Sequence, residues 1–356
     1  MLQSQTANRY AITLDKPFNK WALWAPILLT AIYPFFLNAF HAVVMDASGD
    51  APAPVTAGML LKAAFLLLAA FAVPAMGLVM ACRSHGQDRH QALALRIRRL
   101  GLFIVAVPTL YCFVGVNLLM LGSPVPDEFA WAVLWIGIGA YLVLSPVGDP
   151  SVRPVVRRLP VLRVVHGIAG AVVLLFVLFH LFNHLFGLIS PQVHLAVMEV
   201  GRSVYRSAFV EPVLVLALLF QVFSGLWLAW NWSANGADRY RIVQIGSGVF
   251  LAVFILGHLN AVFIFARTVL GIETGWEFAS GDPVGMIHDP WGIRLLPHYT
   301  LGVLFVISHL FSGLRVVMLS HGAPRRIANR IWWGGLAIGA VVAVAIMLGI
   351  TGVRLG

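Results

Sequence analysis

Three of the histidines that lie within long apolar runs of this 356-residue sequence have neighbours that follow a shared pattern. The segments FHLFNH, GHLNAV and SHLFSG have His180, His258 and His309 as their second residue, and FQVFSG has Gln221 at that position. An ionisable side chain inside a membrane is costly unless it faces the protein interior and finds a partner. These positions are therefore candidates for a functional site.

Depth in the membrane divides these four residues into two pairs. His180 and His258 lie about 14 to 16 residues, or roughly 21 to 24 Å, from the predicted cytoplasmic ends of their helices. Gln221 and His309 lie about 9 or 10 residues, or roughly 14 to 15 Å, from that end. A six-coordinate haem iron needs one imidazole on each side of the macrocycle, from different helices at one depth. The sequence therefore predicts His180 and His258 as haem ligands.

The depth shared by Gln221 and His309 offers only one good iron ligand, His309, because a glutamine side chain is a poor ligand for iron. It could hold no haem, a five-coordinate haem, or only a hydrogen bond between these two side chains. His309 is thus a conditional metal ligand. For all these histidines the alternative roles are hydrogen bonds between helices and a proton path.

Other polar residues lie near these positions. His166 and Arg163 are predicted near the cytoplasmic face, where they could bind haem propionates or quinone oxygens, with interfacial solvation as the alternative. His184 follows His180 by one helical turn and is a candidate for a quinone or proton site. Glu211 is a candidate proton acceptor for quinol.

Membrane-spanning helices must position these residues. The sequence is 60% apolar and 11% charged, and apolar runs long enough to cross a ~30 Å hydrocarbon core recur along it. In lipid every backbone polar group needs an internal partner, and the runs lack the alternation of a membrane barrel, so we expect an all-α integral membrane fold. About nine spans are predicted, near 21–45, 57–81, 101–122, 129–146, 164–188, 208–230, 244–268, 297–319 and 331–352. His194 and His288 fall in predicted loops without a role.

The net charge of +10 comes from arginines and lysines in alternate loops. This distribution indicates that the basic residues set the orientation of the protein in the membrane and do not bind nucleic acid. Since basic loops stay in the cytoplasm, we expect a multi-pass protein of a bacterial-type inner membrane, with its N-terminus cytoplasmic and its C-terminus outside. Cys82 and Cys112 are too few and too far apart for a disulfide framework or a CxxC metal site.

The Pro- and Arg-rich segment 147–160 divides the predicted spans into four and five. Residues 1–146 form an N-terminal four-helix half, and residues 161–356 form a five-helix half. All of the candidate ligands lie in the second half, so the first half is predicted to be free of haem.

The second half resembles the cytochrome b membrane anchor of succinate:quinone and quinol:fumarate oxidoreductases, in its five-span form. The resemblance rests on RVVHGIAG before His180, on YRSAFVEPVLVLALLFQVFSGLWLAW around Gln221, on His258, and on SHLFSGL at His309. RIANRIWWGG then opens a last span without a ligand, as in that family.

This resemblance implies two stacked haems b, with His180 and His258 holding the outer one and Gln221 and His309 in the place of the inner pair. Gln221 departs from the two-haem pattern, so one or two haems are expected. The four additional N-terminal spans are a second departure, and a fused, haem-free partner half is one interpretation of them.

The leading hypothesis is a haem b membrane anchor that transfers electrons between quinone and a partner redox subunit of the iron-sulfur or flavoprotein kind. The chain has no flavin, iron-sulfur or nucleotide motif, so it could not oxidise succinate alone. The alternatives are a haem- or quinone-binding structural or sensory subunit, and a haem-free subunit that handles quinol or protons. In each case we expect the protein to lie in a lipid membrane.

Overall fold

The computed structural model describes residues 20–48, 54–84, 91–146, 159–234 and 238–355, and every regular element in these ranges is a helix. The predicted all-α fold is thus confirmed. Most of the predicted linker at 147–160 lies outside the described residues. The elements are η2 (Lys20–Leu23), α1 (Trp24–Ala31), α2 (Tyr33–Ser48), α3 (Ala57–Arg83), α4 (Gln91–Val105), α5 (Val107–Met120), α6 (Asp127–Leu144), α7 (Pro160–Leu185), η4 (Phe186–Leu188), α8 (Pro191–Tyr205), α9 (Val210–Ser233), α10 (Arg239–Leu259), η5 (Asn260–Leu270), α11 (Trp276–Ser280), η6 (Gly292–Arg294), α12 (Leu295–Ser320) and α13 (Arg325–Ile350).

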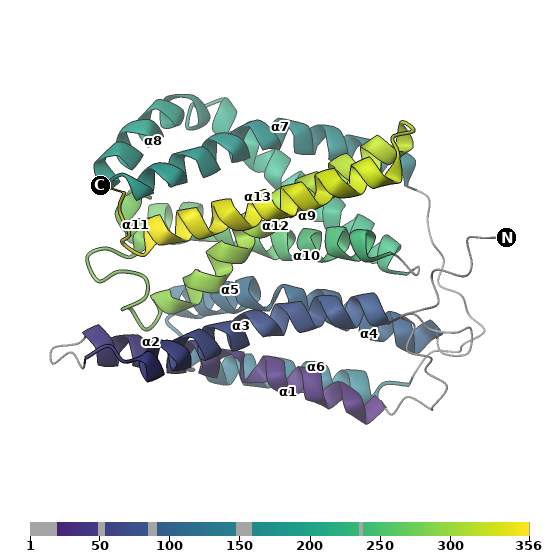
Figure 1. The fold of residues 1–356 in the computed structure, drawn as a ribbon, viewed down its shortest axis with the longest axis horizontal. Coiled ribbons are helices and arrows are strands. Elements are labelled where there is room, and N and C mark those ends of the chain that lie inside the picture. The colour runs from purple at the N-terminus through teal and green to yellow at the C-terminus, as the bar shows by residue number, and fades with distance from the viewer. Residues whose placement is uncertain (1–19, 49–53, 85–90, 147–158, 235–237, 356) are drawn as a thin grey trace.

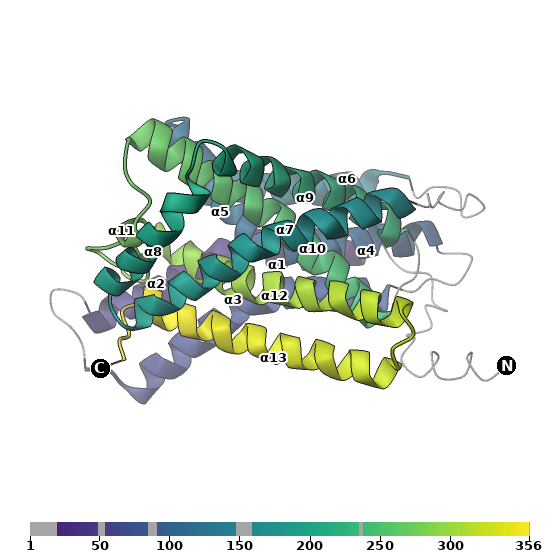
Figure 2. The same ribbon diagram turned by 90° about the horizontal axis from the view of Figure 1, so that it is seen from above.

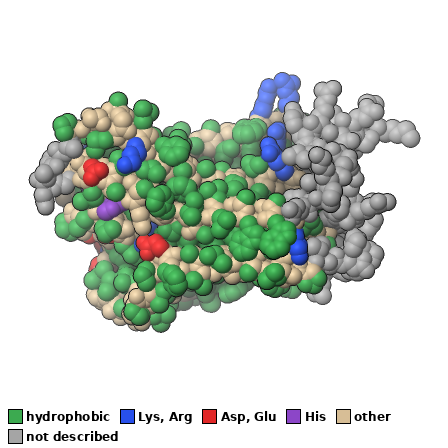
Figure 3. All heavy atoms as spheres, turned by 90° about the horizontal axis from the view of Figure 1, so that it is seen from below, with side chains coloured by type: hydrophobic (Ala, Val, Ile, Leu, Met, Phe, Trp, Pro, Cys, Tyr) green, Lys and Arg blue, Asp and Glu red, His purple; other side chains and the backbone are tan. Residues whose placement is uncertain are grey.

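The long helices run along one direction of the molecule and are apolar enough to cross a membrane (Figure 1). Within the described ranges there are eight such spans, or nine when one bent helix pair counts as a single span, which confirms the predicted number. Apolar side chains cover the middle of the face shown in Figure 3, and charged side chains gather toward its two ends. The protein is therefore a multi-pass membrane protein whose middle contacts lipid.

The predicted span at 101–122 is not a single straight helix. α4 ends at Val105, α5 begins at Val107, and the two helices meet at an angle of 62°. Pro108 lies in the first turn of α5, where it lacks a backbone N–H and its ring crowds the preceding turn. The apolar run continues through the bend, so hydropathy alone predicts an unbroken span.

Two other segments differ from the predicted elements. The supposed loop at 189–207 contains α8, whose first turn is capped by the Ser190 hydroxyl accepting from the Val193 N–H at 3.1 Å. The predicted span at 244–268 begins as α10 and continues from Asn260 as the π-helix η5, which is eleven residues long. Most π-helical segments in proteins are single turns, often at functional sites.

The helices form two groups that lie side by side (Figure 1). The first group comprises the helices of residues 20–146, and the second comprises the helices of residues 159–355. α10 belongs to the second group and lies at the boundary, because it packs against α3, α4 and α5 of the first group and against α9 and α12 of its own. We call the end of the bundle that holds Arg96, Arg239 and Arg325 the basic end, and the opposite one the far end. Helices α8 and α11 lie at the far end (Figures 1 and 2).

A buried ion pair joins the two groups near the far end. Arg294 is 4% exposed, donates to the Asp127 carboxylate, and lies over the Tyr111 ring at 4.5 Å. Gly115 makes room for it, because a Cβ at Gly115 would overlap the Arg294 guanidinium. Removing one member of such a pair leaves the other charge buried and uncompensated.

We expect Arg294→Met to lower the free energy of unfolding by about 3 kcal/mol, because Asp127 then keeps a buried charge without its partner. The double variant with Asp127→Asn should recover part of this loss. The measurement is the unfolding midpoint of the purified protein in detergent. Equal loss in the single and double variants would show that the ion pair does not couple the two groups.

Candidate functional site

Five helices of the second group close a ring. α7 packs against α9 and α13, α10 packs against α9 and α12, and α12 packs against α13. In the part of the chain that the structure describes, α7 has no extended contact with α10 or α12. Side chains from α7, α10 and α12 can therefore meet in the interior of the ring without close contact between these helices.

His180 on α7 and His258 on α10 meet in this interior. Their ring centroids are 5.9 Å apart and their planes are inclined by 70°. A metal–imidazole bond is about 2 Å long and the ring centre lies about 1 Å behind the nitrogen, so two imidazoles on one metal have centroids about 6 Å apart. This spacing would allow His180 and His258 to hold one iron between them, and the structure brings together the pair that the sequence singled out.

Aromatic side chains hold both imidazoles in place. The Phe176 ring stacks on His180 with centroids 5.4 Å apart, and the Phe254 ring stacks on His258 at 5.8 Å. Phe254 also stacks on His298 at 4.5 Å, which lies buried near the start of α12. Phe176 and Phe254 each lie four residues before the candidate ligand on the same helix, and His298 of α12 packs on Phe254.

The histidine cluster continues from this pair toward the far end. The His184 ring lies 4.7 Å from His180 between centroids, and the His194 ring lies 5.2 Å from His184. His194 Nε2 is 3.2 Å from the Asn183 amide nitrogen, and its ring packs against Trp276 at 4.8 Å. The sequence predicted His184 beside His180, but it gave no role to His194.

His194 was missed because it falls in a predicted loop. It is 1% exposed, and together with Met198 and Gly201 it forms the buried face of α8. The three-to-four-residue spacing of these positions is the signal that could have identified an amphipathic helix there. Burial, with a further contribution from the Arg202 charge, lowers the pKa of His194 to about 4, so this imidazole is neutral at physiological pH.

The level nearer the basic end is organised differently from the predicted Gln221 and His309 pair. The Gln221 amide donates to the backbone carbonyl of His166 at 2.9 Å, and its oxygen lies where a Cβ at Gly170 would approach it to 3.5 Å. No hydrogen bond joins Gln221 to His309 in the described structure. Of the three alternatives for this level, the hydrogen bond between Gln221 and His309 is therefore not observed, because Gln221 connects α9 to α7 instead.

His166 lies deeper than predicted. The His166 side chain is half-buried, and its Nδ1 is 2.7 Å from the hydroxyl of Ser224. Ser224 lies one helical turn from Gln221 on α9. The predicted span starts at 164, but α7 starts at Pro160, so His166 enters the bundle by more than one turn. Arg163 stays exposed and is close enough to Arg241 for the two positive charges to repel each other.

His309 is held by α10. Its Nδ1 is 3.1 Å from the Gln244 carbonyl and 3.1 Å from the Ser247 hydroxyl. Gly248 leaves room for the ring, because a Cβ there would lie 3.0 Å from the His309 Cε1 atom.

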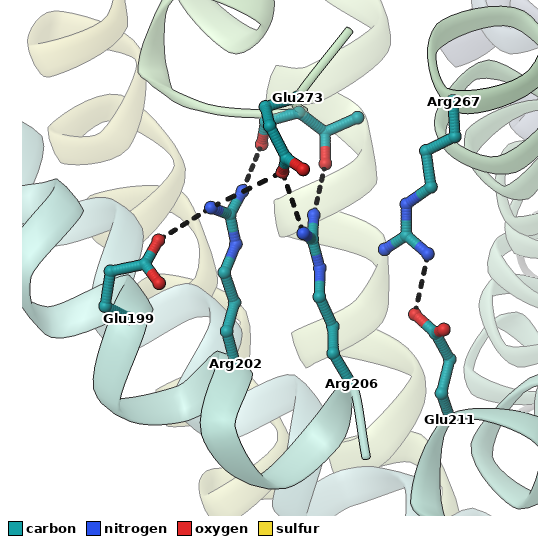
Figure 4. Close-up of polar contacts among 7 residues, drawn as sticks. Glu199, Arg202, Arg206, Glu211, Arg267 and Glu273 are labelled. Carbon is teal, nitrogen blue, oxygen red and sulfur yellow. Dashed lines mark hydrogen bonds and ion pairs between the residues drawn. The ribbon is translucent and has the colours of Figure 1, made fainter. Parts of the chain in front are cut away.

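An ionic cluster closes the far end (Figure 4). Arg206 binds Glu273 at 2.8 Å and donates to the Thr274 hydroxyl, so α8 is tied to the segment after η5. The Arg206 guanidinium holds the pKa of Glu273 below its ordinary value. Glu211, the candidate proton acceptor, accepts a hydrogen bond from Arg267 at 2.8 Å. This ion pair joins α9 to η5.

Comparisons with known proteins leave the site without an assigned family. No protein-family model, curated protein or solved structure matches the chain. Among the described residues, no three His, Cys, Asp or Glu side chains form a metal-ion site. A haem iron takes at most two side-chain ligands, so a haem site does not require a group of three.

Lowering the pH should loosen α8 through His194. Its folded-state pKa of about 4 lies below the ordinary value of 6.5, so the neutral ring stabilises the fold above pH 6.5 and this contribution is lost as the pH falls toward 4. We expect the thermal midpoint in detergent to fall over this range, and to fall less in His194→Gln. An identical pH dependence in the two proteins would contradict this assignment.

Proposed function

We propose that the chain is a haem b-carrying membrane subunit that transfers electrons between membrane quinone and a redox partner. The observation that carries this proposal is the His180 and His258 pair, with ring centroids 5.9 Å apart. Haem iron would supply one-electron chemistry, while the protein provides the ligands and their surroundings. The sequence resemblance to the cytochrome b anchor supports the same assignment.

The chain's own residues suit this role. His180 and His258 come from helices that do not pack closely on each other, and their rings meet edge-on, with planes inclined by 70°, in the interior of the five-helix ring. Phe176 and Phe254 limit rotation of the imidazoles. Lipid-facing helices around the ring keep water away from the pair, which favours neutral imidazoles as ligands.

The proposal places the basic end in the cytoplasm of a bacterial-type inner membrane, because loops rich in Lys and Arg stay on that side. A soluble iron-sulfur or flavoprotein subunit would dock there. Quinone would bind near an interface, with Arg163 as the polar candidate toward the basic end and His184 and Glu211 as the candidates toward the far end.

A second candidate function is proton transfer without haem. The centroid distances of 4.7 and 5.2 Å from His180 through His184 to His194 favour it, because neighbouring imidazoles can exchange protons. In that case, the chain would move protons between the interior of the ring and the far end, as part of a larger complex.

Haem content distinguishes these functions. We expect the purified full-length chain to bind haem and to show b-type absorption in a reduced-minus-oxidised spectrum. His180→Ala and His258→Ala should each remove one low-spin haem, because one axial ligand is lost. His321→Ala, at the exposed end of α12, is the matched control and should keep the full haem content. A wild-type chain without bound haem would refute the proposal and leave proton transfer as the remaining function.

A further inference from the structure

The last span, α13, has one side fixed against the protein. The Trp332 indole N–H donates to the Ser312 hydroxyl of α12 at 2.9 Å, and Trp332 is 4% exposed. Gly335 lies on the same side, where a Cβ would overlap the Phe311 ring of α12. α13 crosses in front of the neighbouring helices in Figure 1, so its opposite side faces away from the bundle.

The outward side of α13 is charged only at its start. Arg326, Arg330 and Trp333 begin it, and all three are exposed. The exposed positions that continue the same side are apolar, namely Ala337, Val341, Val344 and Leu348. At 100° per residue these seven side chains fall within an arc of about 80° around the helix. Polarity therefore changes along this side as it does along a phospholipid, from a charged group to hydrocarbon.

The two arginines of this side lack a partner from the protein. Arg96, at the same end of the bundle, donates to backbone carbonyls at the end of α6. Arg326 and Arg330, in contrast, have neither a hydrogen bond nor an ion pair with any residue that the structure describes. No acidic residue follows Asp289 in the sequence, so neither α12 nor α13 offers a carboxylate to them.

The spacing of these arginines favours an anion between them. Arg326 and Arg330 are four residues apart, so their side chains are neighbours, and like charges at this spacing destabilise a helix. An anion that contacts both would remove the repulsion and accept hydrogen bonds from both guanidinium groups. Guanidinium binds phosphate oxygens in a bidentate manner, so a phosphate diester suits this position.

The apolar part of this side has the length of one lipid leaflet. Trp333 follows the arginines, and tryptophan concentrates at membrane–water interfaces, where lipid headgroups lie. Eleven residues separate Arg330 from Val341, which is about 17 Å along the helix, and half of a ~30 Å hydrocarbon core is about 15 Å. An acyl chain that starts beside the arginines would therefore end near Val341, in the middle of the membrane.

We propose that Arg326, Arg330 and Trp333 form a binding site for an anionic phospholipid, with its phosphate between the two arginines and one acyl chain along Ala337 and Val341. A lipid with a net negative charge is favoured over a zwitterionic one, because the site supplies two positive charges and no negative charge. The inference does not depend on the proposed haem, since this side of α13 faces away from the histidines.

The test is lipid binding by the full-length chain in a neutral detergent, measured by native mass spectrometry with added phosphatidylglycerol or phosphatidylcholine of identical acyl chains. We expect the wild type to bind phosphatidylglycerol more tightly. Arg326→Gln combined with Arg330→Gln should bind it about 30-fold more weakly, because each basic side chain contributes about fivefold to such binding. Arg326→Lys combined with Arg330→Lys keeps both charges and should retain most of the affinity.

The matched control is Arg325→Gln. It removes one positive charge from the same end of α13, but Arg325 lies about 100° or more around the helix from the two arginines. It should keep the wild-type affinity for phosphatidylglycerol.

Four results would overturn the site. The first is equal affinity of the wild type for the two lipids, and the second is wild-type affinity for phosphatidylglycerol in the double glutamine variant. The third is a loss in Arg325→Gln as large as in that variant, which would indicate attraction by overall charge. The fourth is an equally large loss in the double lysine variant, which would exclude binding through the two charges.

Discussion

The free-energy cost of placing an imidazole in hydrocarbon constrains how the helices of residues 159–355 are arranged. A histidine within a membrane span must face the protein interior and be partnered there. Five spans satisfy this requirement by closing a ring, in whose interior His180 of α7 meets His258 of α10 and His309 of α12 bonds to the Gln244 carbonyl of α10. The glycines beside His166 and His309, and the rings stacked on His180 and His258, then follow as consequences of fitting bulky polar rings into that interior.

Much of this arrangement is predictable, because its determinants are local. Apolar runs of about twenty residues predict spans, and the count of residues from a span end gives depth when the helix is regular. His180 and His258 lie on regular helices, α7 and α10, and their predicted common level agrees with their contact. The number of spans follows from hydropathy for the same reason.

Other features escaped prediction because they depend on contacts rather than composition. The depth of His166 depends on where α7 begins, and Pro160 starts that helix before the apolar run does. The bend between α4 and α5 follows from Pro108 within a continuous apolar stretch. The partner of Gln221 could not be read from depth, because the depth of a residue does not reveal which face of the helix it occupies.

The π-helix after α10 bears on how the chain tolerates changes of length. One residue turns an α-helix by about 100°, so inserting or deleting a residue within a span normally rotates every later side chain away from its partner. A π-helix absorbs an additional residue in a widened turn. Along η5 this widening leaves His258 in place while Arg267 still reaches Glu211. A deletion in η5 that restored α-helical spacing would leave His258 in place but break the ion pair between Arg267 and Glu211. The number of residues in η5 therefore matters for the ion pair and not for the candidate ligand.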